Sequence, residues 1–347
     1  MNCRSPLGLR LYRLNFMQRI LSILGLVAVL NLHAGDAFEQ QRRLGRCLNL
    51  GNALEAPNEG EWGWKIADED LSRIKQAGFD SVRIPIRWST HANQSSPYQI
   101  DPVFAERVNQ VVRTALAKGL AVVMNVHHYD ELDANPRAHR ERLAGIWRQI
   151  AEKYQAYPDA LHFEIYNEPH GKLTASEWNA TWALALAEIR KTNPQRAVHI
   201  GGVQWNQSST LKELQLPDGD RHIIGHFHCY APFQFTHQGA DWVNGSSPWI
   251  GTKWVGAPAE QAEIIKVFSL AVEWSKQTQR PVFLGEYGSY GKYADADARV
   301  RWTTFMAATA RKNGIPAAYW EYCAGFGLWS PLEKQWREPL LSAVLGR

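Results

Sequence analysis

Short apolar segments alternate with longer segments of helical pattern along most of this 347-residue chain. The apolar segments are short enough for buried strands, and six of the intervals between them carry apolar residues at helical spacing. Regular alternation of this kind predicts a parallel sheet covered by helices. Because eight strand candidates fall within about 300 residues, we expect an α/β fold of one domain, a closed (β/α)8 or TIM barrel, rather than an open sheet.

The segments expected to form strands are Arg46–Leu50, Ser81–Ile84, Ala121–Val126, Leu161–Tyr166, Ala197–Ile200, Ile223–Phe227, Val282–Leu284 and Ala317–Trp320. The expected helices are Asp68–Ala77, Pro102–Ala117, Arg137–Tyr154, Ala175–Lys191, Ala259–Lys276 and Asp295–Lys312. Glycines 78, 119 and 314 follow three of these helices, as is typical of helix C-termini. The interval 201–221 is the exception, because it shows little helical pattern.

The first 37 residues have the pattern of a secretory signal peptide. Four arginines precede the apolar run Ile20–Leu32, and small residues follow it up to Ala37. Met17 is an alternative start of the chain. The run is short for a membrane span, so we expect no stable membrane anchor, although an uncleaved anchor remains the alternative. The prediction is a signal peptide over residues 1–37, a folded domain over residues 38–347, and a secreted or periplasmic protein.

Charge and cysteine content exclude some classes of protein. Without the four arginines and one aspartate of the predicted signal peptide, the formal charge falls from +4 to +1, so no nucleic-acid partner is indicated. Outside this segment the chain has three cysteines, Cys47, Cys229 and Cys323, without a CxxC pair. All three lie in or next to predicted strands. We therefore expect buried free thiols rather than a disulfide framework.

Two predicted strands lead into glutamates. The segment FEIYNEP contains Glu168 just before Pro169, and the segment VFLGEYG contains Glu286. Ionisable side chains rarely end a buried strand without a partner or a task. A single such glutamate is compatible with a salt bridge at the rim. Two carboxylates at strand ends are what acid–base cleavage of a glycosidic bond requires.

Alternation along the strands predicts which side chains face the interior of the barrel. In the strand before Glu168, apolar residues 161, 163 and 165 should pack against helices. The side chains expected to face the interior are His162, Glu164, Tyr166 and Glu168 of that strand, together with Arg83, Asn125, His127, His226, His228 and Tyr230. Polar side chains at the carboxyl ends of barrel strands are where such folds keep their chemistry.

Seven segments together resemble glycoside hydrolase family 5, of the endo-β-1,4-glucanase or cellulase type. They are LNLGNALEAPNEGEWGW, VRIPIRWSTH, VHHYDEL, FEIYNEPHGKLT, HFHCYAPFQFTHQGADWV, VFLGEYGSY and AYWEYCAGFGLW. The resemblance implies a (β/α)8 barrel and a retaining, double-displacement mechanism that uses neither a cofactor nor a metal.

The resemblance also implies roles for individual residues. Glu168 would be the proton donor and acid/base, and Glu286 the nucleophile. Arg83 and Tyr230 would hold the Glu286 carboxylate. Asn167 would bind the 2-hydroxyl of the sugar at the point of cleavage.

Further residues are implied to support the reaction or to bind sugar. His127 would contact substrate or a carboxylate, and His228 would orient one of the glutamates. Trp320 would be a flat platform for the sugar. The other expected contacts are Asn52 and Glu55 after the first strand, His128, the wall residues His237 and Gln238, and Trp205, with Trp242, Trp249 and Trp254 as possible extensions of the cleft.

The expected partner is a polysaccharide, and the protein is expected to be a monomer. The expected substrate is a β-1,4-glucan (cellulose, carboxymethylcellulose or mixed-linkage glucan), and β-1,4-mannan or glucomannan is the alternative substrate. A catalytically inactive carbohydrate-binding barrel is an alternative of another class. A metal-dependent hydrolase built on His226, His228 and His127 is a further alternative.

Overall fold

The structure is a computed structural model that describes residues 36–347. The predicted signal peptide lies outside the described residues, apart from its last two positions. The described fold starts with α2 (Ala37–Arg43), whose N-cap Asp36 accepts a hydrogen bond from the N–H of Glu39 at 2.8 Å. Ala37 is itself buried. Asp36 and Ala37 are therefore the N-cap and the first residue of α2.

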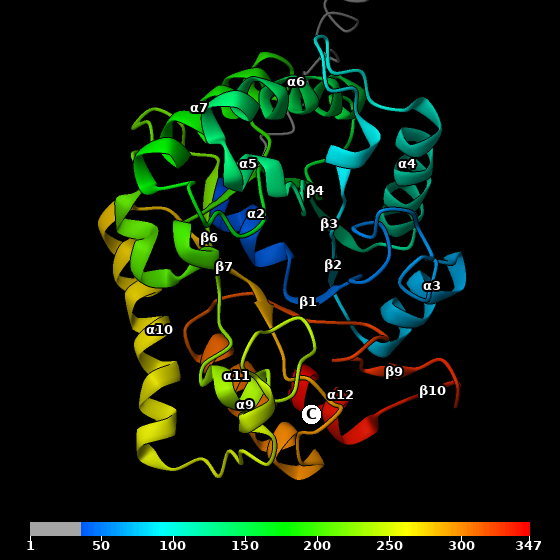
Figure 1. Cartoon of the computed structure of the whole chain (residues 1–347), viewed down its shortest axis with the longest axis vertical. Coiled ribbons are helices and arrows are strands. Elements are labelled where there is room, and N and C mark those ends of the chain that lie inside the picture. Colours follow the sequence, from blue (N-terminus) through cyan, green and yellow to red (C-terminus); the bar gives the residue numbers. More distant parts are fainter. Residues whose placement is uncertain (1–35) are drawn as a thin grey trace, which may run out of the picture. The chain divides into compact units, whose positions relative to one another are not determined.

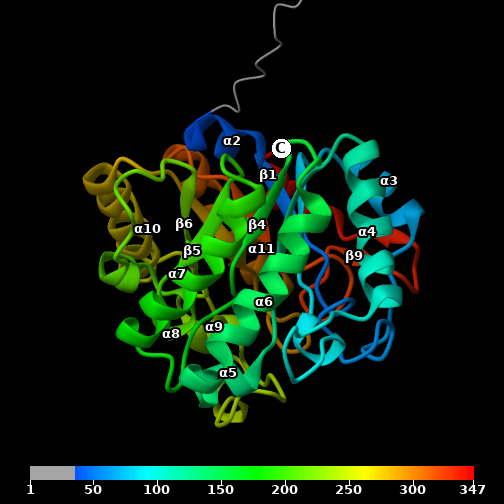
Figure 2. The same ribbon diagram turned by 90° about the horizontal axis from the view of Figure 1, so that it is seen from above.

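Eight parallel strands close into a barrel in the order of the chain, β1 to β8. This confirms the predicted (β/α)8 fold, and all eight expected strands are present. They are β1 (Arg46–Asn49), β2 (Ser81–Ile84), β3 (Ala121–Asn125), β4 (Leu161–Glu164), β5 (Val198–Gly201), β6 (Ile223–His228), β7 (Val282–Tyr287) and β8 (Ala317–Tyr319). Figures 1 and 2 show the strands enclosed by helices.

All six expected helices are present, and shorter ones occur in the loops. The long helices are α3 (Asp68–Ala77), α4 (Pro102–Ala117), α6 (Pro136–Tyr154), α7 (Ala175–Thr192), α10 (Pro258–Thr278) and α11 (Ala296–Lys312). The short ones are α5 (Asp130–Ala134), α8 (Val203–Asn206), α9 (Phe233–Thr236) and α12 (Glu338–Leu345), with 3-10 turns at Trp88–His91, Ser208–Glu213 and Ser247–Trp249. A two-stranded antiparallel pair, β9 (Trp329–Ser330) and β10 (Gln335–Trp336), follows β8.

The connection between β5 and β6 departs from the repeating pattern, as its sequence indicated. Only α8 and the following 3-10 turn occupy it. Three successive residues in α8, Gln204, Trp205 and Asn206, have left-handed backbone angles with φ of 56–58°. Such angles are costly for residues with side chains. This connection therefore holds a specific backbone shape rather than a regular helix.

Two apolar layers position the polar interior. The larger core lies between the strands and the surrounding helices, and includes Val82, Phe163 and Leu284. A smaller cluster contains Cys47, Phe283, Ala37 of α2 and Leu44 at its C-terminal cap. Because Phe283 precedes Glu286 along β7 and Cys47 lies near the start of β1, this cluster fills the amino end of the barrel interior. The polar side chains are thereby left to the other end.

The predicted alternation along β4 is wrong beyond Glu164, where the regular strand ends. Tyr166 was expected to face the interior. Instead its ring lies against Trp178, at 6.1 Å between centroids, and its hydroxyl donates a hydrogen bond to Asp133. The buried carboxylate of Asp133 outside the barrel thus draws the tyrosine outward.

Within residues 36–347 no helix is both long enough and apolar enough to span a membrane. The three cysteines of this part of the chain are free thiols. Burial raises the pKa of Cys47 and of Cys229 to about 12, so both stay protonated at neutral pH.

Candidate active site

Glu168 and Glu286, the two predicted catalytic glutamates, lie together at the carboxyl end of the barrel. Glu168 comes four residues after the end of β4, and Glu286 lies within β7. A carboxylate oxygen of one lies within 4.8 Å of a carboxylate oxygen of the other. The Glu286 side chain is only 6% exposed, whereas that of Glu168 is 25% exposed. The structure therefore gives two nearby carboxylates different access to solvent.

Arg83 and Tyr230 both hold the carboxylate of Glu286. Arg83 Nη1 donates to Glu286 Oε1 at 2.7 Å, and the Tyr230 hydroxyl donates to Oε2 at 2.9 Å. These are the two partners that the family resemblance implied. Burial raises the pKa of Glu286, whereas nearby His228 and Arg83 oppose that rise. Burial and the Glu286 charge raise the pKa of Tyr230 well above its ordinary value, so its hydroxyl stays a donor.

Glu164 is a partner of Arg83 that the sequence did not reveal. It forms a bidentate pair with the fully buried Arg83, from Nε at 2.6 Å and Nη2 at 2.7 Å. Although burial acts to raise the pKa of Glu164, the charge and hydrogen bonds of Arg83 lower it. Glu164 therefore supplies a permanent counter-charge, without which the guanidinium would be buried with too little compensation.

Two asparagines complete the environment of Arg83. Asn49 Oδ1 accepts from Nη1 at 2.9 Å, and Asn167 Oδ1 accepts from Nη2 at 2.8 Å. Asn167 precedes Glu168 in the chain, so the guanidinium links both glutamate-bearing segments. Binding of a sugar 2-hydroxyl by Asn167 stays a prediction.

Glu168 adopts a backbone conformation unusual for a residue with a side chain. Its φ is 51°, and Pro169 follows it. Strained backbone at a glutamate requires support from the surroundings and is often found at functional sites. Burial raises the pKa of Glu168 to about 7, against the opposing charges of Arg83 and His170. A large fraction of this carboxyl group is therefore protonated near neutral pH, as a proton donor needs.

His228 lies between the two glutamates. Its Nδ1 is 2.7 Å from Glu168 Oε1 and 3.6 Å from Glu286 Oε2. Burial lowers the pKa of His228 to about 4, so the ring is neutral at neutral pH. This position suits the predicted orienting role.

His127, His128 and Trp320 lie at the ends of β3 and β8. The rings of His127 and Trp320 are nearly parallel, at 5.7 Å between centroids. His127 Nδ1 contacts Asn125 Nδ2 at 3.1 Å, and burial lowers its pKa well below the ordinary value. The His128 ring meets the edge of Trp62 at 5.8 Å. Trp320 is partly exposed and lies beside this polar group, where a sugar platform was expected.

The loop after β1 gives Glu55 a supporting position. Its carboxylate accepts hydrogen bonds from the backbone N–H groups of Asn52 and Ala53, and the side chain is buried. Burial raises its pKa to about 8. Asn52 has a left-handed backbone, with φ 66°, that this carboxylate helps to hold. Direct contact of Asn52 or Glu55 with sugar stays a prediction.

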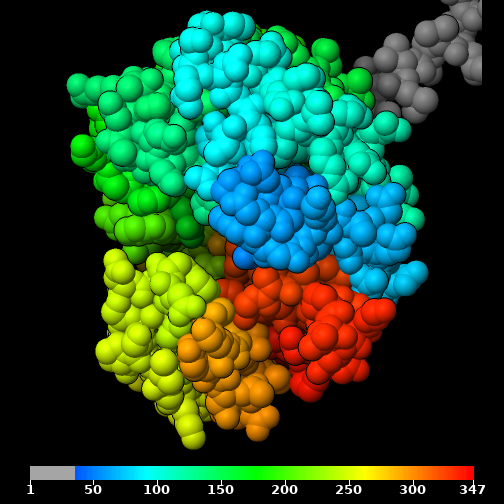
Figure 3. All heavy atoms as spheres, turned by 45° about the vertical axis from the view of Figure 1, so that its right-hand side comes forward, coloured from blue at the N-terminus to red at the C-terminus, as the bar shows by residue number. Residues whose placement is uncertain are grey.

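The connection from β6 to α10 contributes a wall of aromatic and polar residues. The buried His237 ring stacks on Phe233 at 4.2 Å and meets the Tyr230 ring edge-on at 4.8 Å. Gln238 is fully buried and bonds to the backbone of Phe235, Gly251 and Thr252. Gln238 therefore braces the wall. Figure 3 shows the surface dipping between the yellow-green part of this connection and the segments around it.

The four tryptophans suggested for an extended cleft differ in exposure. Trp205 is 54% and Trp242 60% exposed, and Trp205 stacks on His170 at 4.9 Å. Trp249 is partly exposed. The suggestion is wrong for Trp254, because that side chain is buried and packs against Phe305.

Among the described residues, one group has the spacing that could hold a metal ion. It consists of Glu168, His228 and Glu286, each with one ligand atom within 4.8 Å of the others. A cation there would compete with Arg83, which already neutralises Glu286 at 2.7 Å. The metal alternative also used His226. The His226 ring is turned toward His228, and the two Nε2 atoms lie 3.0 Å apart, so they contact each other. The geometry fits a carboxylate pair better than it fits a metal centre.

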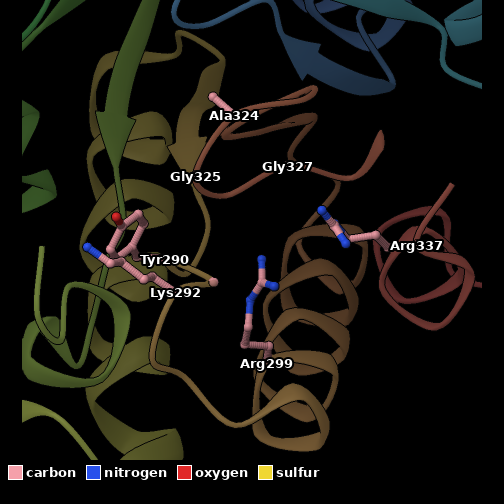
Figure 4. A pocket seen from close by; sticks show the side chains of 8 residues that line it. Tyr290, Lys292, Arg299, Ala324, Gly325, Gly327 and Arg337 are labelled. Atoms are coloured by element: carbon pink, nitrogen blue, oxygen red, sulfur yellow. The ribbon is translucent and has the colours of Figure 1, made fainter. Parts of the chain in front are cut away.

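A separate hollow of about 310 Å3 lies between the loops that follow β7 and β8 (Figure 4). Its lining includes the basic side chains Lys292, Arg299 and Arg337, together with Tyr290. No carboxylate lines it, so it lacks the groups for acid–base chemistry. Tyr290 packs on Trp242 at 4.9 Å, which connects this hollow to the wall of aromatic residues.

Comparison with known proteins identifies the family. The family model for cellulase, glycosyl hydrolase family 5, matches residues 50–325. The chain belongs to this family. Endoglucanase H of Acetivibrio thermocellus is 38% identical over 288 residues, which are 83% of this chain and 30% of that relative. The chain also spans only 35% of Cellulase/esterase CelE of the same organism, at 28% identity.

Solved structures of related proteins superpose closely on this chain. A hyperthermophilic endo-β-1,4-glucanase in complex with substrate has a TM-score of 0.88 at 47% identity, covering 90% of this chain and all of that one. Cel5A of Thermotoga maritima, in complex with mannotriose, has a TM-score of 0.87 at 48% identity, covering 89% of this chain and all of that one. The same Cel5A has been solved with cellobiose.

Proposed function

We propose that the protein is a retaining endo-acting glycoside hydrolase that cleaves internal β-1,4 bonds of glucans. The observation that carries the proposal is the close approach of Glu168 and Glu286 in different environments. Retaining glycosidases hold their two carboxyl groups about 5 Å apart, whereas inverting ones need about 6.5–9.5 Å to admit a water molecule. One oxygen of each carboxylate lies within 4.8 Å of the other, and this close approach supports the retaining arrangement with its covalent intermediate.

In the first step Glu286 attacks the anomeric carbon, and Glu168 gives its proton to the departing oxygen. Arg83 and Tyr230 keep Glu286 ionised and fixed, because both donate to its oxygens. The pKa of about 7 keeps much of Glu168 protonated. The leaving chain departs with that proton.

In the second step Glu168, now ionised, accepts a proton from water, and the oxygen of that water displaces Glu286 from the sugar. His228 Nδ1 lies 2.7 Å from Glu168 and contacts it in both steps. Asn167 binds the 2-hydroxyl, an interaction that strengthens in the transition state. Trp320 supports the sugar ring by apolar contact.

A β-1,4-mannanase or glucomannanase activity at the same site is the second candidate. Cel5A of Thermotoga maritima supports it, because that protein was solved with mannotriose as well as with cellobiose. The two sugars differ in the orientation of the 2-hydroxyl. The proposal includes export to the periplasm or the medium, on the pattern of residues 1–37.

Initial rates on barley mixed-linkage glucan, carboxymethylcellulose, glucomannan and mannan test the substrate class. We expect glucans to be cleaved fastest, with a rapid fall in viscosity that marks internal cleavage. Glu286→Gln should lower the rate at least about 10³-fold, because the nucleophile is lost. Asp241→Asn, an exposed neighbour in the wall, is the matched control. Full activity of Glu286→Gln would overturn the proposal and favour another chemistry.

A further inference from the structure

Four buried histidines line the interior of the barrel beneath the reactive pair. His162 Nδ1 lies 3.0 Å from His199 Nε2, and the His199 and His226 rings lie 5.7 Å apart. His226 Nε2 then lies 3.0 Å from His228 Nε2. The three lower rings are fully buried, and the proposed steps above use none of them.

The contact between His226 and His228 contains one proton. Burial lowers the pKa of both rings, so each is neutral and carries a single N–H. Two nitrogens at 3.0 Å need one donor and one acceptor. The proton of one ring therefore decides where the other ring carries its own.

The surroundings of His226 decide which ring is the donor. His226 Nδ1 is a buried atom with no hydrogen-bond partner among the described residues. A lone pair left unpaired there costs less than an unpaired N–H. The unpaired Nδ1 therefore favours a His226 proton on Nε2, from which it can be donated to His228 Nε2.

Charged groups around the pair are consistent with this arrangement. Glu164 Oε1 lies 3.8 Å from His226 Nε2 and favours a proton on that atom. Burial, and to a lesser extent the positive charge of Arg83, lowers the pKa of both rings and keeps them neutral, while Glu168 and Glu286 face His228 Nδ1.

We infer that His226 is a positioning residue that keeps the proton of His228 on Nδ1. His228 then donates to Glu168 Oε1, so the transferable proton of Glu168 is restricted to Oε2. The inference rests on the proposed function, since it concerns the acid/base of that reaction. Gly285 makes the arrangement possible, because a Cβ at that position would lie 1.8 Å from His226 Nε2.

The tautomer of His228 can be measured without substrate. In protein labelled with 15N-histidine, we expect the His228 signal to show a protonated Nδ1 and an unprotonated Nε2 at pH 7. His226→Phe should allow the other tautomer, whereas His226→Gln, which keeps an N–H near the Nε2 position, should retain the original one. A wild-type His228 protonated on Nε2 overturns the inference.

The pH profile provides the functional readout. Loss of the donated hydrogen bond disfavours ionised Glu168, so in His226→Phe the alkaline limb of kcat/KM should move up by about one pH unit. His226→Gln should keep the wild-type limb. His162→Phe, a matched change in the same interior that contacts neither ring of the pair, should also keep it. An unmoved alkaline limb in His226→Phe contradicts the inference. A wild-type protein that hydrolyses no glycan contradicts the proposed function instead, and the tautomer measurement then decides the inference about His226.

Discussion

Arg83 lies 2.7 Å from Glu286 through one nitrogen and binds Glu164 through its other two. One buried cation therefore serves two carboxylates with different tasks. Glu164 is fully buried and neutralises the guanidinium. Glu286 is held in a fixed orientation, and its second oxygen accepts a hydrogen bond from the Tyr230 hydroxyl. The carboxylate of Glu286, the proposed nucleophile, is held by a cation whose desolvation is already compensated.

Glu164→Gln should weaken both activity and stability. It removes the counter-charge of a buried guanidinium, which typically costs about 3–5 kcal/mol. Arg83 should then bind Glu286 more tightly and make it a poorer nucleophile, lowering kcat by roughly 10–100-fold. Urea unfolding and kcat on a soluble glucan measure the two effects. Glu39→Gln, which breaks the exposed pair with Arg43, is the control and should change neither. A Glu164→Gln protein of wild-type stability would contradict this role.

The pH dependence of kcat/KM should follow the two glutamates. Glu168 must be protonated, so the rate should fall as pH rises through about 7. Glu286 must be ionised, so the rate should also fall on acidification, with a limb above pH 4.5 because burial raises its pKa. Glu168→Gln should lose the alkaline limb on an aryl glycoside whose leaving group needs no proton. An alkaline limb near pH 5 in the wild type would show that the environment of Glu168 is not as described.

Acid should destabilise the fold partly through His162. Burial lowers its pKa from 6.5 to about 3, so the folded protein binds this proton less readily than the unfolded chain does. The stabilisation is complete above pH 6.5 and is lost as pH falls toward 3. His162→Phe should reduce the slope of unfolding free energy against pH in this window by up to about 1.4 kcal/mol per unit. Denaturant titrations at several pH values measure the slope, and an identical slope in both proteins would reject the assignment.

Trp205 and Trp254 should respond oppositely to alanine. Trp205 is half exposed beside His170, so its loss should raise KM for polymer roughly fivefold, about 1 kcal/mol, without lowering the melting temperature. Trp254 is buried against Phe305, so its loss should cost about 3–5 kcal/mol of stability and leave KM unchanged. Kinetics and thermal unfolding of both variants separate contact with substrate from packing. Equal KM values for Trp205→Ala and the wild type would remove Trp205 from the cleft.

Local pattern was sufficient for the barrel, because each strand and helix is defined by its own residues. The alternation of segments predicts all eight strands, and the weak helical pattern of residues 201–221 agrees with the absence of a long helix around Trp205. Pairings between distant segments could not be predicted in the same way. Glu164 and Glu168 occupy equivalent positions in the alternating pattern, yet Glu164 faces Arg83 and Glu168 faces His228.

Two features explain why the partners of Glu164 and Glu168 could not be predicted from the alternating pattern. The strand ends at Glu164, and Asp133 of α5 draws Tyr166 outward, so alternation no longer describes the chain that follows. The left-handed backbone at Glu168 depends on its neighbours rather than on its own preference. Residue types indicated which chemistry was available. Only the folded chain shows the different partners and environments of the individual carboxylates.

The stereochemistry of the first product tests the central claim most directly. Proton NMR during hydrolysis of a soluble β-1,4-gluco-oligosaccharide resolves the anomeric configuration of the newly formed reducing end before it equilibrates. The close approach of the two carboxylates, with one oxygen of each within 4.8 Å of the other, predicts two displacements and hence a β product first. A first-formed α product would contradict a covalent intermediate on Glu286.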